Sequence, residues 1–539
     1  MMKSMKQDKK QTKGLPFFGI GKIMPYARKY RPLLVIMVGC GLLSSAVDTV
    51  LPLYQRYALN HFVGGGVLDT LPIYIAIYFL TIVAAGGVNY ISCALAMRIE
   101  VSMNKDLRNA AFNHLQTLSF SYFNQNSVGY IHARVMSDTS RIGSLVSWSL
   151  MEGTWQMAYL VGAVAVMLVI NAKLALMILA IVPLITVLFS VFQKKLVAVN
   201  REIREVNSKI TSDFNEGITG AKTIKTLVIE DSITEHFVED TSEMLRKTVR
   251  SAHLRGLFAA TMNLASSLAL AIVLWRGGYI AADEVGTFSM FMSYAQCMME
   301  PVRWVIDCIS DLITTQVNIE RFSKLMETKS DVADTPEVIE KYGDSFNAKR
   351  ENWEELHGDI EFRDVSFKYP DGDEYVLEHF NLKIPFGTNI AIVGETGAGK
   401  STLVNLVCRF FEPTSGQVLI DGRDARERSQ LWLHSSIGYV LQTPHLFSGT
   451  VRENLLYGNP DATDEEIAEA LRLVSADGII EKLENGLESD VGEGGDLLST
   501  GEKQLISFAR AILAKPRILV LDEATASVDT ITEQKIQSA

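Results

Sequence analysis

Residues 389–402 read Asn-Ile-Ala-Ile-Val-Gly-Glu-Thr-Gly-Ala-Gly-Lys-Ser-Thr, and this stretch decides the fold of the second half of the chain. The apolar run 389–393 predicts a strand, the glycine-rich segment predicts a phosphate-binding loop, and residues 403–410 predict the helix that follows it. Glycines let backbone N–H groups close around phosphate oxygens at a helix N-terminus, where an anion is favoured. The motif therefore predicts nucleotide binding, with Lys400 on the β- and γ-phosphates and Ser401 as a ligand of Mg²⁺. The predicted cofactor-binding residues of this loop are Gly394, Glu395, Thr396, Gly397, Ala398, Gly399, Lys400, Ser401 and Thr402.

A second apolar run, residues 517–523, reads Arg-Ile-Leu-Val-Leu-Asp-Glu and ends in two carboxylates. In a parallel sheet, the carboxyl end of such a strand lies beside the phosphate loop, so Asp522 is predicted to be a ligand of Mg²⁺. Glu523 is predicted to be the catalytic residue that polarises a water molecule against the γ-phosphate. From residue 360 onward, short β-type runs alternate with helical ones, which is typical of an α/β domain with a parallel sheet.

The segment Leu498-Ser-Thr-Gly-Glu502, shortly before the second run, points to a particular family. It resembles the signature motif of ATP-binding cassette (ABC) proteins, and the residues up to 511 are similar to its usual continuation. Three more positions resemble family motifs. Gln442 resembles the Q-loop glutamine, with a catalytic and Mg²⁺-binding role, Tyr369 resembles the aromatic residue that stacks on adenine, and Asp529 resembles the D-loop aspartate.

The resemblance implies that two chains act together, because in this family each ATP lies between the phosphate loop of one cassette and the signature of the other. Ser499 and Gly501 are then expected to bind the nucleotide of the second chain. We favour two identical chains. The signature has Thr500 and Glu502 where glycine and glutamine are usual, so a heterodimer with one weakened site stays open. The family's switch histidine is missing before the end at Ala539, so either the sequence is incomplete or this chain cannot complete a turnover alone.

The first 310 residues contain six apolar stretches long enough to span a membrane as helices. A mean hydropathy of +0.15 agrees with a membrane-embedded portion. Two long charged segments between the spans, 98–141 and 194–255, have helical spacing and predict helices that continue into the cytosol. The six predicted spans are 32–55, 70–97, 142–170, 174–193, 256–275 and 285–306.

The predicted fold class is multi-domain. An all-α six-helix transmembrane domain with long cytosolic extensions is followed by an α/β P-loop (RecA-like) nucleotide-binding domain, to which the resemblance adds the ABC α-helical subdomain. The predicted domains are a basic tail and elbow helix at 1–31, a transmembrane domain at 32–325, a linker at 326–357 and a C-terminally incomplete nucleotide-binding domain at 358–539.

Charge sets the predicted orientation. Residues 1–31 contain nine Lys and Arg residues but only one acidic residue, Asp8, and this places the N-terminus in the cytosol. We therefore predict a multi-pass protein of the plasma membrane with a cytosolic nucleotide-binding domain. Acidic residues outnumber basic ones by 62 to 51, so a nucleic-acid partner is not expected.

Two intracellular segments resemble the coupling loops of the exporter branch, in which short helices dock on the nucleotide-binding domains. The residues that carry this resemblance are Asn126, Gly129, Arg134 and Asp138 in the first segment, and Glu216, Gly217 and Gly220 in the second. The fusion of membrane and ATPase parts also resembles exporters rather than importers, which usually keep these parts on separate chains.

The predicted function is ATP-driven export of a hydrophobic or amphipathic substrate (a drug, lipid or peptide) by alternating access. Aromatic and methionine residues of the last span, such as Met290 and Tyr294, suit such cargo, although they are also ordinary packing residues. The alternative from another class is a non-transporting, ATP-gated membrane regulator. Glu523 argues against that alternative, because a cassette that only binds ATP needs no catalytic base.

Charged residues within the predicted spans are few. Asp48 and Glu152 are each either functional residues that face a cavity or structural ones. For Glu300, Arg303 and Asp307, the spacing favours ion pairs within one helix.

Overall fold

The computed structural model describes residues 19–272, 274–275, 285–395, 397–522 and 533. The chain divides into two compact units. Unit 1 consists of residues 1–111 and 132–325, and unit 2 consists of residues 112–131 and 326–539. The predicted domain boundaries are drawn differently and stay predictions.

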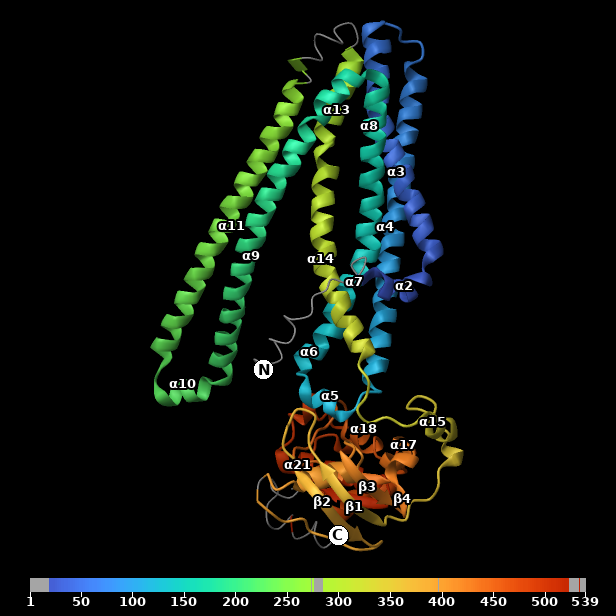
Figure 1. Cartoon of the computed structure of the whole chain (residues 1–539), viewed down its shortest axis with the longest axis vertical. Helices are drawn as coiled ribbons and strands as arrows, with labels where there is room; N and C mark the ends of the chain where they lie inside the picture. Colours follow the sequence, from blue (N-terminus) through green and yellow to red (C-terminus); the bar gives the residue numbers. More distant parts are fainter. Residues whose placement is uncertain (1–18, 273, 276–284, 396, 523–532, 534–539) are drawn as a thin grey trace. The chain divides into compact units, whose positions relative to one another are not determined.

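Unit 1 is built of long helices, most of which extend side by side (Figure 1). Two of them, α4 and α14, continue at one end into unit 2. The helices are α2 (Ile20–Arg28), α3 (Arg31–Ala58), α4 (Leu71–Leu115), α7 (Thr139–Ser144), α8 (Leu150–Leu179), α9 (Ile181–Thr219), α10 (Ala221–Leu227), α11 (Glu230–Ile272), α13 (Val285–Cys297) and α14 (Met299–Glu327). Three π-helical turns, η3 (Leu59–Gly64), η4 (Ala133–Asp138) and η5 (Leu145–Ser149), extend or join them.

Four helical stretches of the described chain are long and apolar enough to cross a membrane, namely 31–64, 71–115, 128–179 and 230–272. These stretches agree with the predicted helical membrane region, whereas the count of six stays a prediction. The predicted span 285–306 is divided between α13 and α14, and α13 has only 13 residues. The predicted span 174–193 lies mostly in α9, where Lys194 and Lys195 follow a short apolar run.

The core of unit 1 forms where α8 packs on α13. Small and flexible side chains, including Ala163 and Met167 on α8, are fully buried against Phe291 and Tyr294 on α13. The hydroxyl of Tyr294 donates to the carbonyl oxygen of Thr49 at 2.5 Å, which ties α13 to α3. This buried hydrogen bond and the apolar contacts hold α3, α8 and α13 in one register.

Helices α9 and α11 form a hairpin joined by the short helix α10 (Figure 1). The chain turns at Gly220, and Val228 ends α10 in the left-handed conformation with φ of 52°. Along the hairpin, the ring of Phe258 lies 5.0 Å from that of Phe189. The charged segment 194–255 therefore folds back on itself instead of forming one continuous helix.

Among its described residues, unit 2 contains two separate sheets. The larger is antiparallel, in the order β2 (Leu377–Ile384), β1 (Ile360–Phe367), β3 (Ser415–Ile420) and β4 (Arg423–Asp424). The smaller pairs β5 (Ile437–Val440) with β6 (Ile518–Leu521) in parallel. The prediction of a parallel sheet in this domain is therefore wrong for the first four strands, which pair antiparallel. The connections from β1 to β2 and from β3 to β4 are too short for the crossover that parallel strands need.

The predicted strand at 389–393 is also not found. These residues make no ladder hydrogen bonds within the described chain, and Val393 is 87% exposed. An apolar run becomes a strand only when a neighbouring edge accepts its backbone groups, and here β6 pairs with β5 alone. The helix predicted after the loop is confirmed, although it begins at Lys400 and ends at Val407.

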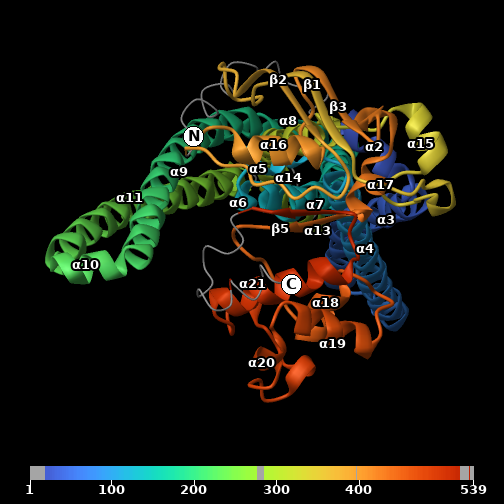
Figure 2. The same cartoon turned by 90° about the horizontal axis from the view of Figure 1, so that it is seen from below.

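The helices of unit 2 form two groups, with α18 to α21 gathered apart from the antiparallel sheet (Figure 2). Helix α21 is amphipathic, and its buried side packs against α18, α19 and β5. Helix α16 packs on the antiparallel sheet. The helices are α5 (Phe120–Gln125), α6 (Val128–His132), α15 (Pro336–Tyr342), α16 (Lys400–Val407), α17 (Gln430–Ser435), α18 (Val451–Leu456), α19 (Asp464–Leu473), α20 (Asp477–Ile480) and α21 (Thr500–Leu513).

Candidate functional site

The predicted phosphate loop leads directly into α16. Gly397 and Gly399 both have φ of +88°, a backbone conformation that residues with a Cβ atom rarely adopt. Lys400 is the first residue of the helix, and its Nζ donates to the carbonyl oxygens of Gly394 at 2.8 Å and Glu395 at 3.1 Å. The lysine thus folds over the loop, and its charge lies at the helix N-terminus, where phosphate oxygens are favoured.

Tyr369 lies beside the phosphate loop and is held in place by its neighbours. Its hydroxyl lies 2.9 Å from Oγ1 of Thr402, which belongs to α16. Its ring meets Phe367 and Phe411 edge-on, with centroid separations of 5.0 and 5.2 Å. Tyr369, the predicted adenine-binding residue, and Thr402, a predicted residue of the phosphate loop, therefore belong to one cluster of contacts. The stacking of Tyr369 on adenine stays a prediction.

The parallel pair β5–β6 brings two predicted metal ligands to one edge. Val440 is paired with Leu521, and the N–H of Asp522 donates to the carbonyl oxygen of Val440 at 3.1 Å. Asp522 directly follows β6, and Gln442 lies two residues after β5 ends. Parallel strands in register expose their carboxyl ends at the same edge, so both polar side chains emerge there.

Tyr439 contacts this edge from β5. Its hydroxyl donates to Oδ2 of Asp522 at 3.4 Å. Burial, and then the neighbouring Asp522 carboxylate, raise the pKa of Tyr439, so the phenol stays protonated and remains a donor at neutral pH. The hydrogen bond orients the carboxylate and was not foreseen from the sequence.

The signature segment forms the start of α21. Ser499 is the N-cap, its Oγ accepts from the N–H of Glu502 at 3.3 Å, and Oε2 of Glu502 accepts from both the N–H and the hydroxyl of Ser499 at 2.8 Å. This capping box gives the unusual Glu502 a structural role, because it satisfies orphan donors of the helix N-terminus. The spacing Ser-x-x-Glu at 499–502 is the sequence pattern of a capping box, but this cap was not predicted from the sequence.

The phosphate loop and the signature are separate in the part of the chain that the structure describes. Among the residues that the structure describes, no hydrogen bond or ion pair connects Ser499 or Gly501 with residues 394–402. Three other predicted site residues, Thr396, Glu523 and Asp529, lie outside the described residues.

An aromatic path connects the segment 112–131 with the carboxylate edge. Phe120 on α5 stacks on Phe410 at 5.5 Å between centroids. Phe410 in turn meets the ring of Tyr439 at 5.8 Å, and Tyr439 donates to Asp522. All four residues belong to unit 2. A displacement of α5 can therefore be transmitted to Asp522 through three direct contacts.

Two hydrogen-bonding contacts join the segment 112–131 to the rest of unit 2. The N–H of Asp331 donates to Oγ of Ser119 at 3.4 Å. Nε2 of His114 lies 3.0 Å from the carbonyl oxygen of Thr328. The sequence does not indicate that Phe120 and Phe410 are partners, because they lie on segments far apart in the chain.

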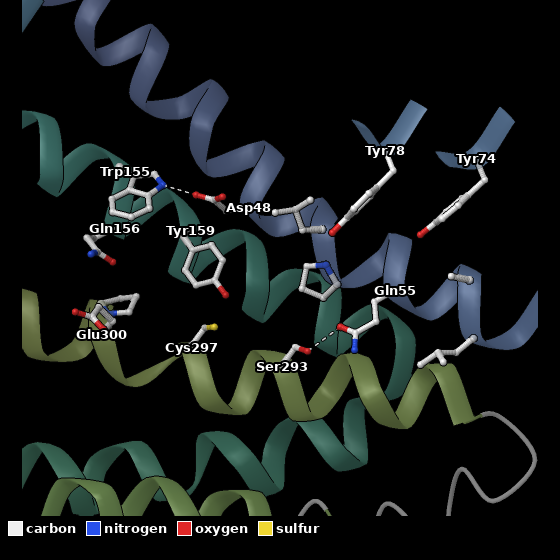
Figure 3. A pocket seen from close by; sticks show the side chains of 15 residues that line it. Asp48, Gln55, Tyr74, Tyr78, Trp155, Gln156, Tyr159, Ser293, Cys297 and Glu300 are labelled. Carbon is white, nitrogen blue, oxygen red and sulfur yellow. Dashed lines mark hydrogen bonds between the residues drawn. The ribbon is translucent and has the colours of Figure 1, made fainter. Parts of the chain in front are cut away.

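Unit 1 contains a cavity of about 820 Å³ between α3, α4, α8, α13 and α14. Figure 3 shows its labelled residues converging from these helices. The indole Nε1 of Trp155 donates to Asp48 at 2.7 Å, and the hydroxyl of Ser293 donates to Gln55 at 3.0 Å. A volume of this size accommodates a drug-sized molecule.

One cluster in the α9–α11 hairpin has the residue types of a cation site. Ligand atoms of Asp213, His236 and Asp240 lie within 4.8 Å of one another. Nζ of Lys209 donates to Oδ1 of Asp240 at 2.5 Å. Because Lys209 already supplies a positive charge, we interpret the cluster as an ion network that joins the two helices, and we assign no metal to it.

Comparisons with known proteins agree with this arrangement. The family model described as "ABC transporter transmembrane region" matches residues 34–302, and the one described as "ABC transporter" matches residues 377–526. The chain is 31% identical to the "Putative multidrug export ATP-binding/permease protein YgaD" of Bacillus subtilis, over 96% of this chain and 89% of that protein. It is 30% identical to the "Uncharacterized ABC transporter ATP-binding protein YfiC" of Bacillus subtilis, over 98% of this chain and 85% of that protein. It is 33% identical to the "ATP-dependent lipid A-core flippase" of Desulfotalea psychrophila, over 88% of this chain and 80% of that protein.

Proposed function

The chain belongs to the ABC transporter family, as an ATPase coupled to transport with its membrane region and cassette in one polypeptide, and we propose that it exports an amphipathic or hydrophobic molecule by alternating access. The observation that carries the proposal is the aromatic path from Phe120 to Asp522. An intracellular segment between two membrane helices is packed directly on the cassette. Cassette closure can therefore be passed to the membrane helices as a rigid-body movement.

The cassette residues support a division of roles around ATP. Positive-φ glycines and Lys400 fit a phosphate group at the start of α16, and Tyr369 offers an aromatic ring beside it. Bound Mg²⁺ would neutralise the β- and γ-phosphate charge, with Ser401, Gln442 and Asp522 as its proposed ligands. We further propose Glu523 as the residue that polarises the attacking water, and Asp529 as a residue of the second chain's nucleotide site.

A second half-transporter completes the proposed machine. The support for this is that Ser499 and Gly501 are not bonded to the phosphate loop of their own chain in the described structure. We favour a homodimer, because Glu502 is accommodated in the capping box without displacing Ser499. A heterodimer with one weakened site is the alternative. We place the assembly in the plasma membrane, with the basic N-terminus and the cassette in the cytosol.

Transport into inside-out membrane vesicles tests the export proposal. In this orientation the cassette faces the medium, and we expect a lipophilic dye to accumulate inside the vesicles when ATP is added. A non-hydrolysable ATP analogue is the control and is expected to support no sustained accumulation. ATP hydrolysis without ATP-dependent uptake of any apolar, lipid-like or peptide probe would instead favour the regulator alternative.

Replacing Phe120 with alanine tests the coupling path. We expect transport to fall roughly fivefold while basal ATP hydrolysis is unchanged, because the lost ring contact contributes to coupling but not to nucleotide binding. The measurement is dye transport per ATP hydrolysed. Phe123→Ala is the matched control, since Phe123 lies on the same helix and packs on Tyr122 instead. Equal losses in both variants would contradict a specific role for the Phe120–Phe410 contact.

A further inference from the structure

The cavity of unit 1 contains two carboxylates and no basic side chain among its described lining residues. Asp48 comes from α3 and Glu300 from α14. The partner of Asp48 is the neutral indole of Trp155, at 2.7 Å. Ionised side chains at membrane depth are costly unless they face a cavity or a partner of opposite charge. The described lining of the cavity therefore presents two acidic groups to its interior without a basic side chain to neutralise them.

Arg303, a basic residue on the same helix as Glu300, is already paired. Nε of Arg303 lies 3.6 Å from Oδ2 of Asp307 on the same helix. Within the described residues, no ion pair links Arg303 to Glu300. The sequence-based expectation of an internal Glu300–Arg303 pair is therefore wrong, whereas the expected Arg303–Asp307 pair is confirmed. Glu300 remains available to a ligand of the cavity.

Aromatic rings form much of the rest of the cavity wall. Tyr74 and Tyr78 of α4 lie nearly parallel, with centroids 6.0 Å apart and an interplanar angle of 10°. Trp155 and Tyr159 line the cavity from α8. In Figure 3, Asp48 lies beside Trp155 and Tyr159, and Glu300 lies on the facing helix. Faces of aromatic rings attract cations through their quadrupole, and most strongly when water is excluded.

We propose that this cavity selects organic cations with an apolar body, such as hydrophobic ammonium or phosphonium compounds. Asp48 and Glu300 supply the compensating charge, and the rings of Trp155, Tyr159, Tyr74 and Tyr78 cover the apolar body. The inference rests on the proposed export function and gives it a substrate class. A lipid with an anionic headgroup is disfavoured, because both carboxylates repel it. A single inorganic ion is a poor fit to a cavity of about 820 Å³.

Two probes of nearly equal size and shape separate charge from hydrophobicity. Tetraphenylphosphonium is a cation, and tetraphenylborate is the corresponding anion. We expect equilibrium dialysis against the full chain in nanodiscs to show saturable binding of the cation only, after subtraction of binding to empty nanodiscs of the same lipid. Equal saturable binding of both probes, or of neither, would overturn the proposal.

Isosteric variants locate the charge. Asp48→Asn keeps an acceptor for the Trp155 indole, and Glu300→Gln keeps the side-chain length, so both should fold. Each is expected to weaken binding of tetraphenylphosphonium about tenfold, because one nearby negative charge is lost. Glu152→Gln is the matched control, since Glu152 is a carboxylate of α8 that accepts a hydrogen bond from Trp304 at 3.2 Å and does not line the cavity.

The outcomes distinguish this inference from the export proposal. If all three variants bind the cation as the unaltered chain does, the charge assignment is wrong even where ATP-dependent export of neutral dyes persists. If Glu152→Gln weakens binding as much as the cavity variants do, the loss follows from removing any carboxylate of the membrane region. The assignment to Asp48 and Glu300 then also fails. If binding depends on Asp48 and Glu300 but ATP drives no uptake into inside-out vesicles, the cation site stands and the export proposal fails.

Discussion

Replacing Lys400 with methionine is expected to reduce ATP hydrolysis by roughly 100-fold or more. The Nζ of Lys400 lies 2.8 Å from the carbonyl oxygen of Gly394, at the mouth of the loop that the positive-φ residues Gly397 and Gly399 create. Methionine retains an unbranched apolar stem of similar length but cannot donate a hydrogen bond or carry a charge. The variant therefore removes the cation that would meet the phosphate oxygens and leaves the packing of α16 intact.

Two measurements on the full chain in nanodiscs separate binding from hydrolysis. Lys400→Met is expected to weaken the binding of a fluorescent ATP analogue and to abolish vanadate-sensitive hydrolysis. Glu523→Gln is the companion variant, and we expect it to bind the analogue normally while hydrolysis is lost, because only the group that polarises water is removed. Hydrolysis near the unaltered level in Lys400→Met would show that this loop is not the catalytic phosphate site.

Replacing Arg409 with methionine is expected to destabilise unit 2 by about 3 to 5 kcal/mol. Arg409 is only 2% exposed, and its guanidinium lies at the centre of a buried network. It donates to Asp334 at 2.8 Å, to Glu412 at 3.1 Å and to the carbonyl oxygen of Arg428 at 2.8 Å. Methionine fills part of the volume but leaves Asp334 and Glu412 without this counter-ion, and the carbonyl oxygen of Arg428 without this donor.

Thermal unfolding of the full chain measures this effect. A loss of this size corresponds to a fall of roughly 10 °C in the unfolding midpoint of a unit of about 230 residues. Arg363→Met is the matched control, because Arg363 forms an exposed pair with Glu361 at 2.6 Å, and exposed pairs contribute little. If the unfolding midpoint falls equally in both variants, the buried ion network of Arg409 does not account for the loss of stability.

The local parts of the cassette were predictable because their chemistry is contiguous in sequence. Residues 394–402 combine the glycines, the lysine and the start of a helix in one short segment, and the structure places Lys400 at the first position of that helix. The run before Asp522 likewise becomes β6. Such features depend on backbone conformation and neighbouring residues, which a sequence pattern records directly.

Patterns were less reliable where a neighbouring element decides the outcome. The apolar run 389–393 has strand character but forms no ladder in the described chain, since a strand needs a partner edge. Similarly, hydropathy indicated spans at 174–193 and 285–306, but the helix boundaries divide these stretches differently. The sequence indicates apolar character, whereas the packing partners determine where each element begins and ends.

The sequence by itself determined the family, the phosphate loop and a membrane region followed by a cassette, because each of these is carried by consecutive residues. Only the tertiary structure placed Phe120 on Phe410, and Asp48 beside Trp155 in a cavity that Glu300 also lines. These residues lie on elements far apart in the chain. Their meeting depends on the rotation and register of packed helices, which the periodicity of any one helix leaves undetermined.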